Sequence, residues 1–343
     1  MLTFPLRFVL LLKVVLLLMS SLVYGQAGGD RVFEFLEISP TAQITALGRQ
    51  QVALGYDSIR VQEVTQFAFN PALNQQEVHQ QVSLHYTPYY ADISQVSLGY
   101  SYHRDKIGTF GVALQYLNYG SLESFDAAGL PTGDFSAQDF AVVLNYSHEM
   151  RPFRLGGNWK LVNSQISGYT ATGLLADISG VFRHPTQDLT VALVFSNFGF
   201  LLRDELSAGI RELPTDVKIG VSVKPQYMPF RFHLTVYRLI RGYDYWVRDG
   251  EELGVGGQLL RHLSFGSELL LSPNFQLRVG YNHLTRSTLQ LLQTAGGAGF
   301  TYGLMFRSNT FRVDFSRAVL HAAGGYNQFS LSFDLDQLFS RNL

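Results

Sequence analysis

The residues that could carry chemistry in this chain are charged side chains on the polar face of alternating polar and apolar segments. Glu268 and Arg278 form the sharpest pair, because a turn at 272–274 would place them directly opposite each other. Further charged residues that alternation places on polar faces are Arg312, Asp314 and Asp177. Such ion pairs on a barrel wall could line a pathway or hold a plug, but a cross-strand stabilising pair is the more common role.

Catalytic signatures are missing from the sequence. The chain has no cysteine, which excludes thiol nucleophiles, disulfides and cysteine metal sites, and it contains neither HExxH nor GxSxG. The nine histidines show no ligand spacing, and His283 falls on an apolar file near a loop, as interfacial residues do. We therefore predict a protein that is not an enzyme and has no cofactor or metal; a barrel enzyme is the least favoured alternative.

A turn-rich segment at 120–137 is the second candidate site. Its characteristic residues are Asp126, Gly129, Pro131, Gly133 and Asp134. The carboxylates could bind calcium, although this composition is more typical of a plain surface loop. Because exposed loops on a rigid scaffold carry recognition, we predict a partner-binding surface loop here.

The elements that would position these residues are strands. The 343 residues carry a net charge of only −1, which leaves no electrostatic footprint for nucleic acid. From about residue 78 onward, apolar residues recur at every second position, as in FGVALQY (110–116) and FTYGLMF (300–306). This period of two predicts strands with one apolar and one polar face.

Counting these segments predicts about fourteen strands. They cover 78–86, 94–104, 107–119, 138–148, 153–166, 171–183, 188–199, 214–224, 229–242, 257–271, 275–286, 298–307, 310–319 and 326–335. The connections alternate between tight turns, near 105–106, 151–152, 184–185, 226–227, 273 and 308–309, and longer loops such as 120–137, 200–213, 243–256 and 287–297. An even strand number with short turns on one rim is typical of an outer-membrane barrel. Each segment is near the roughly ten residues that a tilted strand needs to cross a bilayer.

Two hairpins test the faces of these strands. A two-residue turn at 308–309 would place Phe306 opposite Phe311 and Gly303 opposite Asp314. The turn at 272–274 places apolar residues opposite each other in the same way. We therefore predict an all-β, antiparallel transmembrane β-barrel with apolar residues toward lipid and polar residues toward the lumen. Two soluble sandwiches remain an alternative, but they would need a linker that the sequence does not contain.

Two segments precede the barrel. Residues 1–25 are typical of an export signal, with Arg7 and Lys13 before an apolar run and cleavage before Gln26. An uncleaved anchor is the alternative, although the uncharged run is short for the roughly 20 residues that span a membrane as a helix. Residues 26–77 do not alternate and are predicted to be a plug-like periplasmic segment, followed by the barrel at 78–343.

Several stretches of the chain resemble a known family. LRHLSFGSELLLSPNFQLRVGYNHLTRSTLQL (260–291), GGAGFTYGLMF (296–306) and RAVLHAAGGYNQFSLSF (317–333) resemble the PorV/PorQ family of type IX secretion system outer-membrane proteins. FNPALN (69–74) and parts of 120–180 are similar to segments of the same group. Barrels of this group are similar to the fourteen-stranded long-chain fatty acid channels.

The resemblance implies a non-catalytic role in the cell outer membrane. It implies that the barrel is needed for translocation and surface attachment of cargo proteins that carry a C-terminal sorting domain. The expected partners are outer-membrane lipid, a surface-exposed adaptor and a sortase-type protease. No cofactor is expected. The alternative is an outer-membrane channel for hydrophobic molecules such as long-chain fatty acids.

Overall fold

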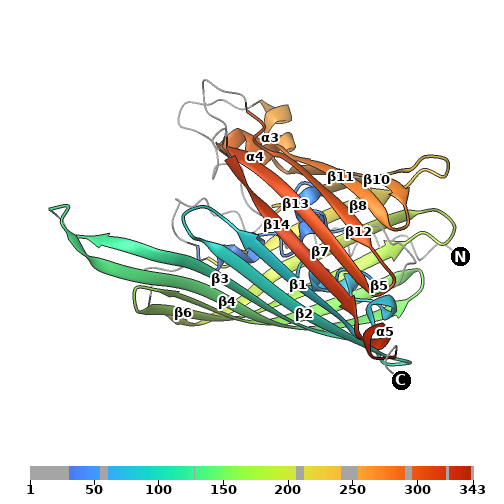
Figure 1. Cartoon of the computed structure of the whole chain (residues 1–343), viewed down its shortest axis with the longest axis horizontal. Coiled ribbons are helices and arrows are strands. Elements are labelled where there is room, and N and C mark those ends of the chain that lie inside the picture. Colours follow the sequence, from blue (N-terminus) through green and yellow to red (C-terminus); the bar gives the residue numbers. More distant parts are fainter. Residues whose placement is uncertain are drawn as a thin grey trace, which may run out of the picture.

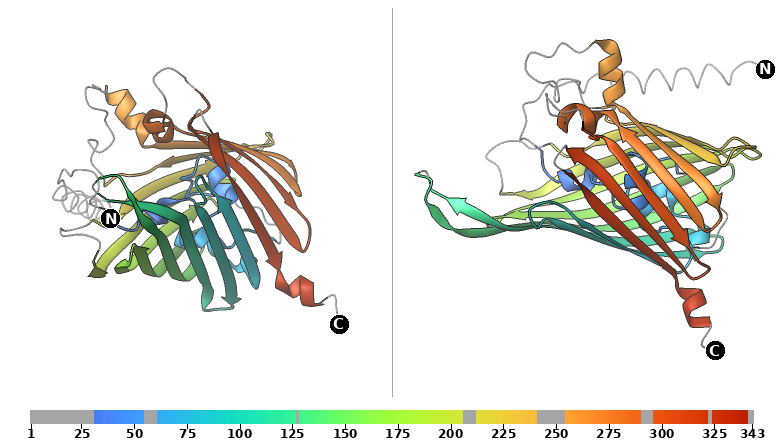
Figure 2. Two further views of the ribbon diagram at one scale, coloured as in Figure 1. Left: turned by 60° about the vertical axis from the view of Figure 1, so that its left-hand side comes forward. Right: turned by 45° about the horizontal axis from the view of Figure 1, so that its top comes forward.

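The polypeptide forms a closed barrel of fourteen antiparallel strands (Figures 1 and 2), in which β1 pairs with β14. This is a computed structural model, and it describes residues 31–54, 61–126, 128–205, 212–240, 254–289, 296–321 and 324–340. The predicted fold class and strand number are therefore confirmed. The predicted export signal at 1–25 and most of the predicted loop at 243–256 lie outside the described residues.

The strands follow the chain around the barrel. Their bounds are β1 Gln81–Pro88, β2 Ser94–Arg104, β3 Gly108–Phe125, β4 Pro131–Met150, β5 Phe153–Ile166, β6 Tyr169–Arg183, β7 Leu189–Asp204, β8 Asp216–Val223, β9 Phe230–Val236, β10 Leu263–Ser272, β11 Phe275–Asn282, β12 Phe300–Arg307, β13 Phe311–His321 and β14 Gly324–Asp334. The helices are η1 Glu34–Glu37, α2 Ala42–Ala46, η2 Thr65–Ala68, η3 Pro71–Leu73, η4 Gln76–Val78, α3 Val255–Arg261, α4 His283–Leu289 and α5 Leu335–Ser340.

The two faces of the wall are segregated as the alternation predicts. Large apolar side chains such as Leu144, Trp159 and Ile178 are exposed on the outer surface. The polar residues that alternate with them, among them Asn158 and Asp177, are buried inside the barrel. An apolar outer belt with a polar interior is the arrangement that a lipid bilayer requires of a barrel.

Helices occupy two places where strands are predicted. Helix α3 covers the start of the predicted strand at 257–271, and α4 begins at His283, so β11 ends at Asn282 rather than 286. The Asn282 side chain accepts a hydrogen bond from Thr285 N at 3.0 Å, which favours a helix start. The assignment of His283 to an apolar strand file is therefore wrong. Among the described residues, no helix is long and apolar enough to cross a membrane.

The predicted loop at 120–137 is largely a β-hairpin, so that prediction is wrong in its local structure. Strands β3 and β4 continue past their neighbours and pair with each other from Ser121↔Ser136 to Phe125↔Pro131. Alternating polar and apolar residues extend the ladder, and the short connection between the strands is closed by Asp126 N donating to Leu130 O at 2.9 Å. The hairpin projects from the barrel at the left of Figure 1.

The predicted strand register is correct for one of the two tested hairpins and shifted for the other. Strands β10 and β11 pair with Glu268 opposite Arg278, as predicted. Strands β12 and β13 pair with Phe306 opposite Val313, which shifts the predicted register by two residues. The turn is longer than predicted, because Ser308 N bonds Phe311 O at 2.8 Å. A shift by two leaves every side chain on its predicted face, because the side-chain period of a strand is two.

Residues 31–54 and 61–78 lie inside the barrel and are called the plug here; they are blue in the left view of Figure 2. Helix α2 begins after Thr41, whose side chain accepts a hydrogen bond from Ile44 N. Asn70 joins the two parts of the plug, since its Nδ2 donates to Val52 O at 2.7 Å. Most apolar side chains of the plug are fully buried, so the plug is a packed element rather than a loose tail.

Candidate functional site

Charges of alternating sign run along the inner wall from β9 to β13. Arg278 Nε lies 2.9 Å from Glu268 Oε1, and the same guanidinium contacts Asp314. Arg312 Nε lies 2.6 Å from Asp314 Oδ2. Arg231 Nη1 lies 3.4 Å from Glu268 Oε2 at the other end. We call these five residues the charge chain; all of them are buried.

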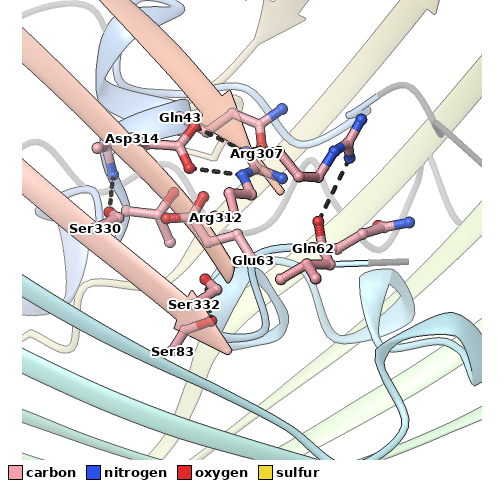
Figure 3. Close-up of polar contacts among 12 residues, drawn as sticks. Gln43, Gln62, Glu63, Ser83, Arg307, Arg312, Asp314, Ser330 and Ser332 are labelled. Atoms are coloured by element: carbon pink, nitrogen blue, oxygen red, sulfur yellow. Dashed lines mark hydrogen bonds and ion pairs between the residues drawn. The ribbon is translucent and has the colours of Figure 1, made fainter. Parts of the chain in front are cut away.

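The plug is bound to the charge chain through Gln43 of α2. Gln43 Nε2 donates to Glu268 Oε1 at 3.2 Å, and its Oε1 accepts from Arg312 Nη2 at 2.8 Å. The same oxygen accepts from Gln66 Nε2 at 2.8 Å. Figure 3 shows Gln43, from the plug, beside Arg312 and Asp314 of the wall. The side-chain amide of Gln43 thus bonds to an acidic and a basic residue of the wall, Glu268 and Arg312, and to Gln66 in the second part of the plug.

Glu63 brings an additional carboxyl from the plug to this region. Its Oε2 accepts from Gln66 Nε2 at 3.2 Å, and its Oε1 lies 3.2 Å from Nδ1 of His85 on β1. Burial raises the pKa of the Glu63 carboxyl to about 7, and the negative charge of Asp314 adds to the rise. Glu63, Arg312 and Asp314 are seen together in Figure 3.

A second polar cluster lies on strands β4 to β7. Lys160 Nζ is 2.7 Å from Asp177 Oδ2, and Asn158 Nδ2 donates to the same carboxylate at 2.8 Å. The cluster also binds the plug, because Asn158 Nδ2 donates to Phe67 O at 2.9 Å and Asn145 Nδ2 donates to Pro71 O at 3.2 Å. The predicted residue Asp177 is therefore part of the wall that holds the plug.

Glycines on the polar files mark where plug backbone touches the wall. A Cβ at Gly156 would lie 2.4 Å from Ala72 N, and one at Gly280 would lie 2.2 Å from Gly48 N. Real Cβ atoms do not approach backbone so closely, so only glycine fits at these positions. The polar and steric contacts together fill the middle of the lumen with the plug.

Near the rim that carries the longer connections, the side chains that line the lumen become mostly apolar. There several inward residues of β3 to β6 are apolar, and they pack against the first part of the plug. One buried carboxylate lies beside them: Asp139 of β4 pairs with Leu117 of β3, and its Oδ2 accepts a hydrogen bond from the Tyr119 hydroxyl at 2.7 Å. This mouth cluster consists of Val32, Phe33, Phe35 and Leu36 of the plug with Leu117, Ala141, Val162, Ala171 and Leu175 of the wall. Phe33 has φ 62, a left-handed conformation that costs an aromatic residue roughly 1–2 kcal/mol.

The structure places the predicted site residues in three separate parts of the molecule. Glu268, Arg278, Arg312 and Asp314 come together in the charge chain, and Asp177 lies in the second polar cluster. Asp126, Gly129, Pro131, Gly133 and Asp134 lie at the tip of the β3–β4 hairpin. Within the described ranges, no group of three or more histidine, aspartate or glutamate residues could hold a metal ion.

Sequence reasoning missed the residues that connect these groups. Arg231 lies on the polar face of FRFHLTV, and applying hairpin parity to β9 and β10 would have placed it opposite Glu268, as the structure does. Gln43 and Glu63 have no comparable signal, because the plug lacks periodicity. Glycines on polar files were a usable signal for plug contact.

Comparisons with known proteins give a result at the level of the fold. No family model and no curated protein matches the chain. The solved structure of the Pseudomonas putida toluene transporter TodX is 12% identical with a TM-score of 0.52, covering 86% of this chain and 96% of that chain. The Ralstonia pickettii toluene transporter TbuX is 11% identical with a TM-score of 0.51, covering 88% and 98%. At this identity the likeness shows the fold: the chain is an outer-membrane β-barrel of the architecture found in these transporters.

Proposed function

We propose that this protein is a non-catalytic outer-membrane channel for small hydrophobic molecules. The observation that carries the proposal is the mouth cluster, where apolar wall residues line the lumen and pack against apolar side chains of the plug. Two structures that share the barrel fold are toluene transporters, which supports the same function. Fold alone does not imply function, so the proposal depends on the lining of the mouth.

The geometry favours an apolar substrate over an ion or a sugar. The middle of the lumen is filled by a plug that is bound through buried charges and amides. A hydrophobic molecule would gain about 25 cal/mol for each Å² that it buries against Val162, Leu175 and their neighbours. The strained Phe33 and the apolar residues beside it occupy this surface now, so they are the groups that such a molecule would displace.

A charge placed in the mouth tests the channel. The variant Val162→Asp should lower uptake of radiolabelled toluene at least tenfold in cells that lack their own hydrocarbon channel, because it adds to the buried Asp139 a second carboxylate, which each passing molecule must desolvate. Ser97→Asp is the matched control, since Ser97 is buried in the lumen outside the cluster and its hydroxyl has no partner among the described residues. Toluene uptake that is equal in both variants, or that never exceeds cells without the protein, would contradict the proposal.

The second candidate is an anchoring component of the type IX secretion system. It is favoured by the β3–β4 hairpin, which extends beyond the neighbouring strands and offers exposed backbone and side chains to a partner. The resemblance of the sequence to the PorV/PorQ family points the same way. In this role the barrel holds a surface adaptor and a sortase-type protease, and cargo with a C-terminal sorting domain becomes attached to the cell surface.

One deletion experiment separates the two candidates. In cells that lack the gene, the channel function predicts reduced uptake of toluene and fatty acid with normal attachment of a sorting-domain cargo. The secretion function predicts the reverse. Complementation with Val162→Asp should restore cargo attachment if only secretion matters, whereas a chain without hairpin residues 121–136 should fail to restore it.

A further inference from the structure

Arg49 is a cation inside the barrel that has no acidic partner among the residues the structure describes. Its Nη1 donates to Thr285 Oγ1 at 3.3 Å, and its Nε is covered and lacks a hydrogen-bond partner. Part of the side chain remains accessible. Removing a guanidinium from water without a counter-charge costs several kcal/mol, so an anion at this position would offset a large penalty.

Phenol groups lie beside this cation. The Tyr326 ring centroid is 5.8 Å from Arg49 Cζ, and the buried Tyr326 hydroxyl has no hydrogen-bond partner within the described ranges. The Tyr89 ring is 4.5 Å from the Tyr326 ring. Tyr237 lies near the same guanidinium, and its hydroxyl donates to Asn282 Oδ1 at 3.0 Å. A guanidinium that has no carboxylate partner among the described residues and keeps a free Nε, next to a buried phenol, is a donor set suited to a carboxylate or a phosphate.

The backbone is built to present Arg49 at this point. Helix α2 ends at Ala46 with Leu47 as its C-cap, and the chain continues through Gly48, with φ 96, to Arg49, with φ 74. Arg49 N donates to Ile44 O at 2.9 Å, which closes the end of the helix. A left-handed conformation is unfavourable for a residue other than glycine, and here that conformation holds the arginine among the tyrosines.

Asn282 holds the opposite side of the site. Its Oδ1 accepts from the hydroxyls of Tyr237 and Thr285, and Thr285 in turn accepts from Arg49. Its Nδ2 donates to Gly48 O at 3.2 Å, which joins the β11 wall to the end of α2. The guanidinium is therefore held by the wall and the plug together, although neither supplies a negative charge to it.

The site adjoins the mouth cluster through Tyr89. This ring packs against the mouth cluster as well as against Tyr326. A ligand with an anionic head at Arg49 would therefore place an apolar tail toward Phe33 and Phe35. We propose that Arg49, with Tyr326, binds the carboxylate or phosphate head of an amphiphile whose tail lies in the mouth cluster. This inference deepens the proposed channel function, on which it rests.

Equilibrium binding tests the site directly. The purified protein in a neutral maltoside detergent is titrated with dodecanoate, dodecyl phosphate and dodecanol, with heat as the readout. A charge-assisted hydrogen bond contributes about 1.5–3 kcal/mol, so Arg49→Gln should weaken binding of an anionic probe roughly tenfold to 150-fold. Dodecanol should bind more weakly and equally to parent and variant. Arg203→Gln, at an exposed arginine on β7, is the matched control and should change nothing.

Other measurements keep the test decisive. Tyr326→Phe removes one hydroxyl and should weaken anion binding several-fold while the barrel keeps its heat-dependent gel mobility. The site binds carboxylates if dodecanoate alone depends on Arg49, and it binds phosphate esters if dodecyl phosphate alone does. Equal binding of dodecanoate by parent and Arg49→Gln would overturn the site. If the parent moves no toluene in cells and yet binds dodecanoate through Arg49, the channel proposal fails and the anion site stands.

Discussion

At the scale of single residues, Glu268 holds the charge chain together. It contacts Arg278 and Arg231 and accepts a hydrogen bond from Gln43 of the plug. The change Glu268→Gln leaves two buried guanidinium groups without this counter-charge, so we expect a loss of roughly 3–5 kcal/mol in the free energy of unfolding. Urea unfolding in detergent micelles, extrapolated linearly to zero urea, measures the loss.

The control for this prediction is the same change at the short-turn rim. Glu149 pairs with Arg151, which is largely exposed, and lies at the outer limit of an ion pair, 3.9 Å, from Arg154. Exposed ion pairs contribute about 0–1 kcal/mol, so Glu149→Gln should change the free energy of unfolding by no more than that. Similar losses for the two variants would mean that the charge chain is screened by water in the lumen.

Glu63 makes plug stability depend on pH. Its pKa is about 7 in the folded protein and near 4.5 when it is exposed, so the folded state binds the proton more tightly. The stability that this group contributes is full below pH 4.5 and is lost as the pH rises to about 7, by roughly 3 kcal/mol. Unfolding of parent and Glu63→Gln at pH 5 and pH 8 checks this: the variant should gain relative to the parent only at pH 8. If the difference in the free energy of unfolding between parent and Glu63→Gln were the same at pH 5 and pH 8, the pKa of Glu63 would lie in its ordinary range.

Only part of the candidate site could be predicted residue by residue. Glu268 and Arg278 belong to one hairpin, so local parity was enough to pair them. The contact of Arg278 with Asp314 spans two strand positions around the barrel, and Gln43 comes from a segment without periodicity. Such contacts depend on closure of the barrel and docking of the plug, which alternation alone does not encode.

At the scale of elements, plug docking depends on glycines in β5 and β11. A methyl group at Gly156 would collide with the backbone of Pro71 and Ala72, whereas one at the neighbouring Gly157 would meet only Asp177 O at 3.7 Å. We therefore expect Gly156→Ala to displace η3 and to increase hydrogen exchange in residues 61–78. Gly157→Ala should leave exchange unchanged. Equal exchange in the two variants would show that the plug can shift without cost.

The β3–β4 hairpin should be dispensable for folding. Beyond Asn118 and before Ala137 the strand ladder pairs its two arms only with each other, and one further backbone hydrogen bond, from Ser167 N to Ser136 O at 3.2 Å, lies at the base of the hairpin; the arms therefore contribute little to closing the barrel. Replacing residues 121–136 with a short turn should leave the midpoint of urea unfolding within experimental error of the parent. A large drop in the midpoint would mean that the hairpin stabilises the wall and is not simply a projecting surface.

The elements show where sequence patterns succeed and fail. The bounds of β2 and β5 match the predicted strands, because their alternation is regular and their turns are short. The shift of β12 against β13 arose from a turn whose length the sequence leaves open. The segment at 283–289 continues apolar alternation for too few residues to exclude a helix, and the Asn282 cap decides its structure.

At the scale of the whole molecule, barrel and plug form one unit whose lumen has two differently filled regions. The middle is filled by backbone and paired polar groups, and the mouth is filled mainly by apolar side chains, with Asp139 buried beside them. Barrel diameter grows with strand number: eight-stranded barrels are filled by side chains, and those of sixteen to eighteen strands hold aqueous channels. Fourteen strands lie near the wide end of this range, so we expect the lumen to admit water once the plug has left it. Ionic conductance therefore reports whether the plug is in place.

Conductance in planar bilayers should distinguish a filled lumen from an open one. The parent should give little steady current at neutral pH, because the plug fills the middle of the lumen. In the double variant Gly156→Ala with Gly280→Ala, the added methyl groups would lie 2.4 Å and 2.2 Å from plug backbone, so the plug should be released and discrete channel openings should appear. The double variant Gly157→Ala with Gly180→Ala is the control, since its methyl groups meet only ordinary contacts at 3.7 Å and 3.5 Å. Large, continuous current through the parent would contradict a plugged lumen, and with it the idea that hydrophobic molecules enter at the mouth without letting ions through.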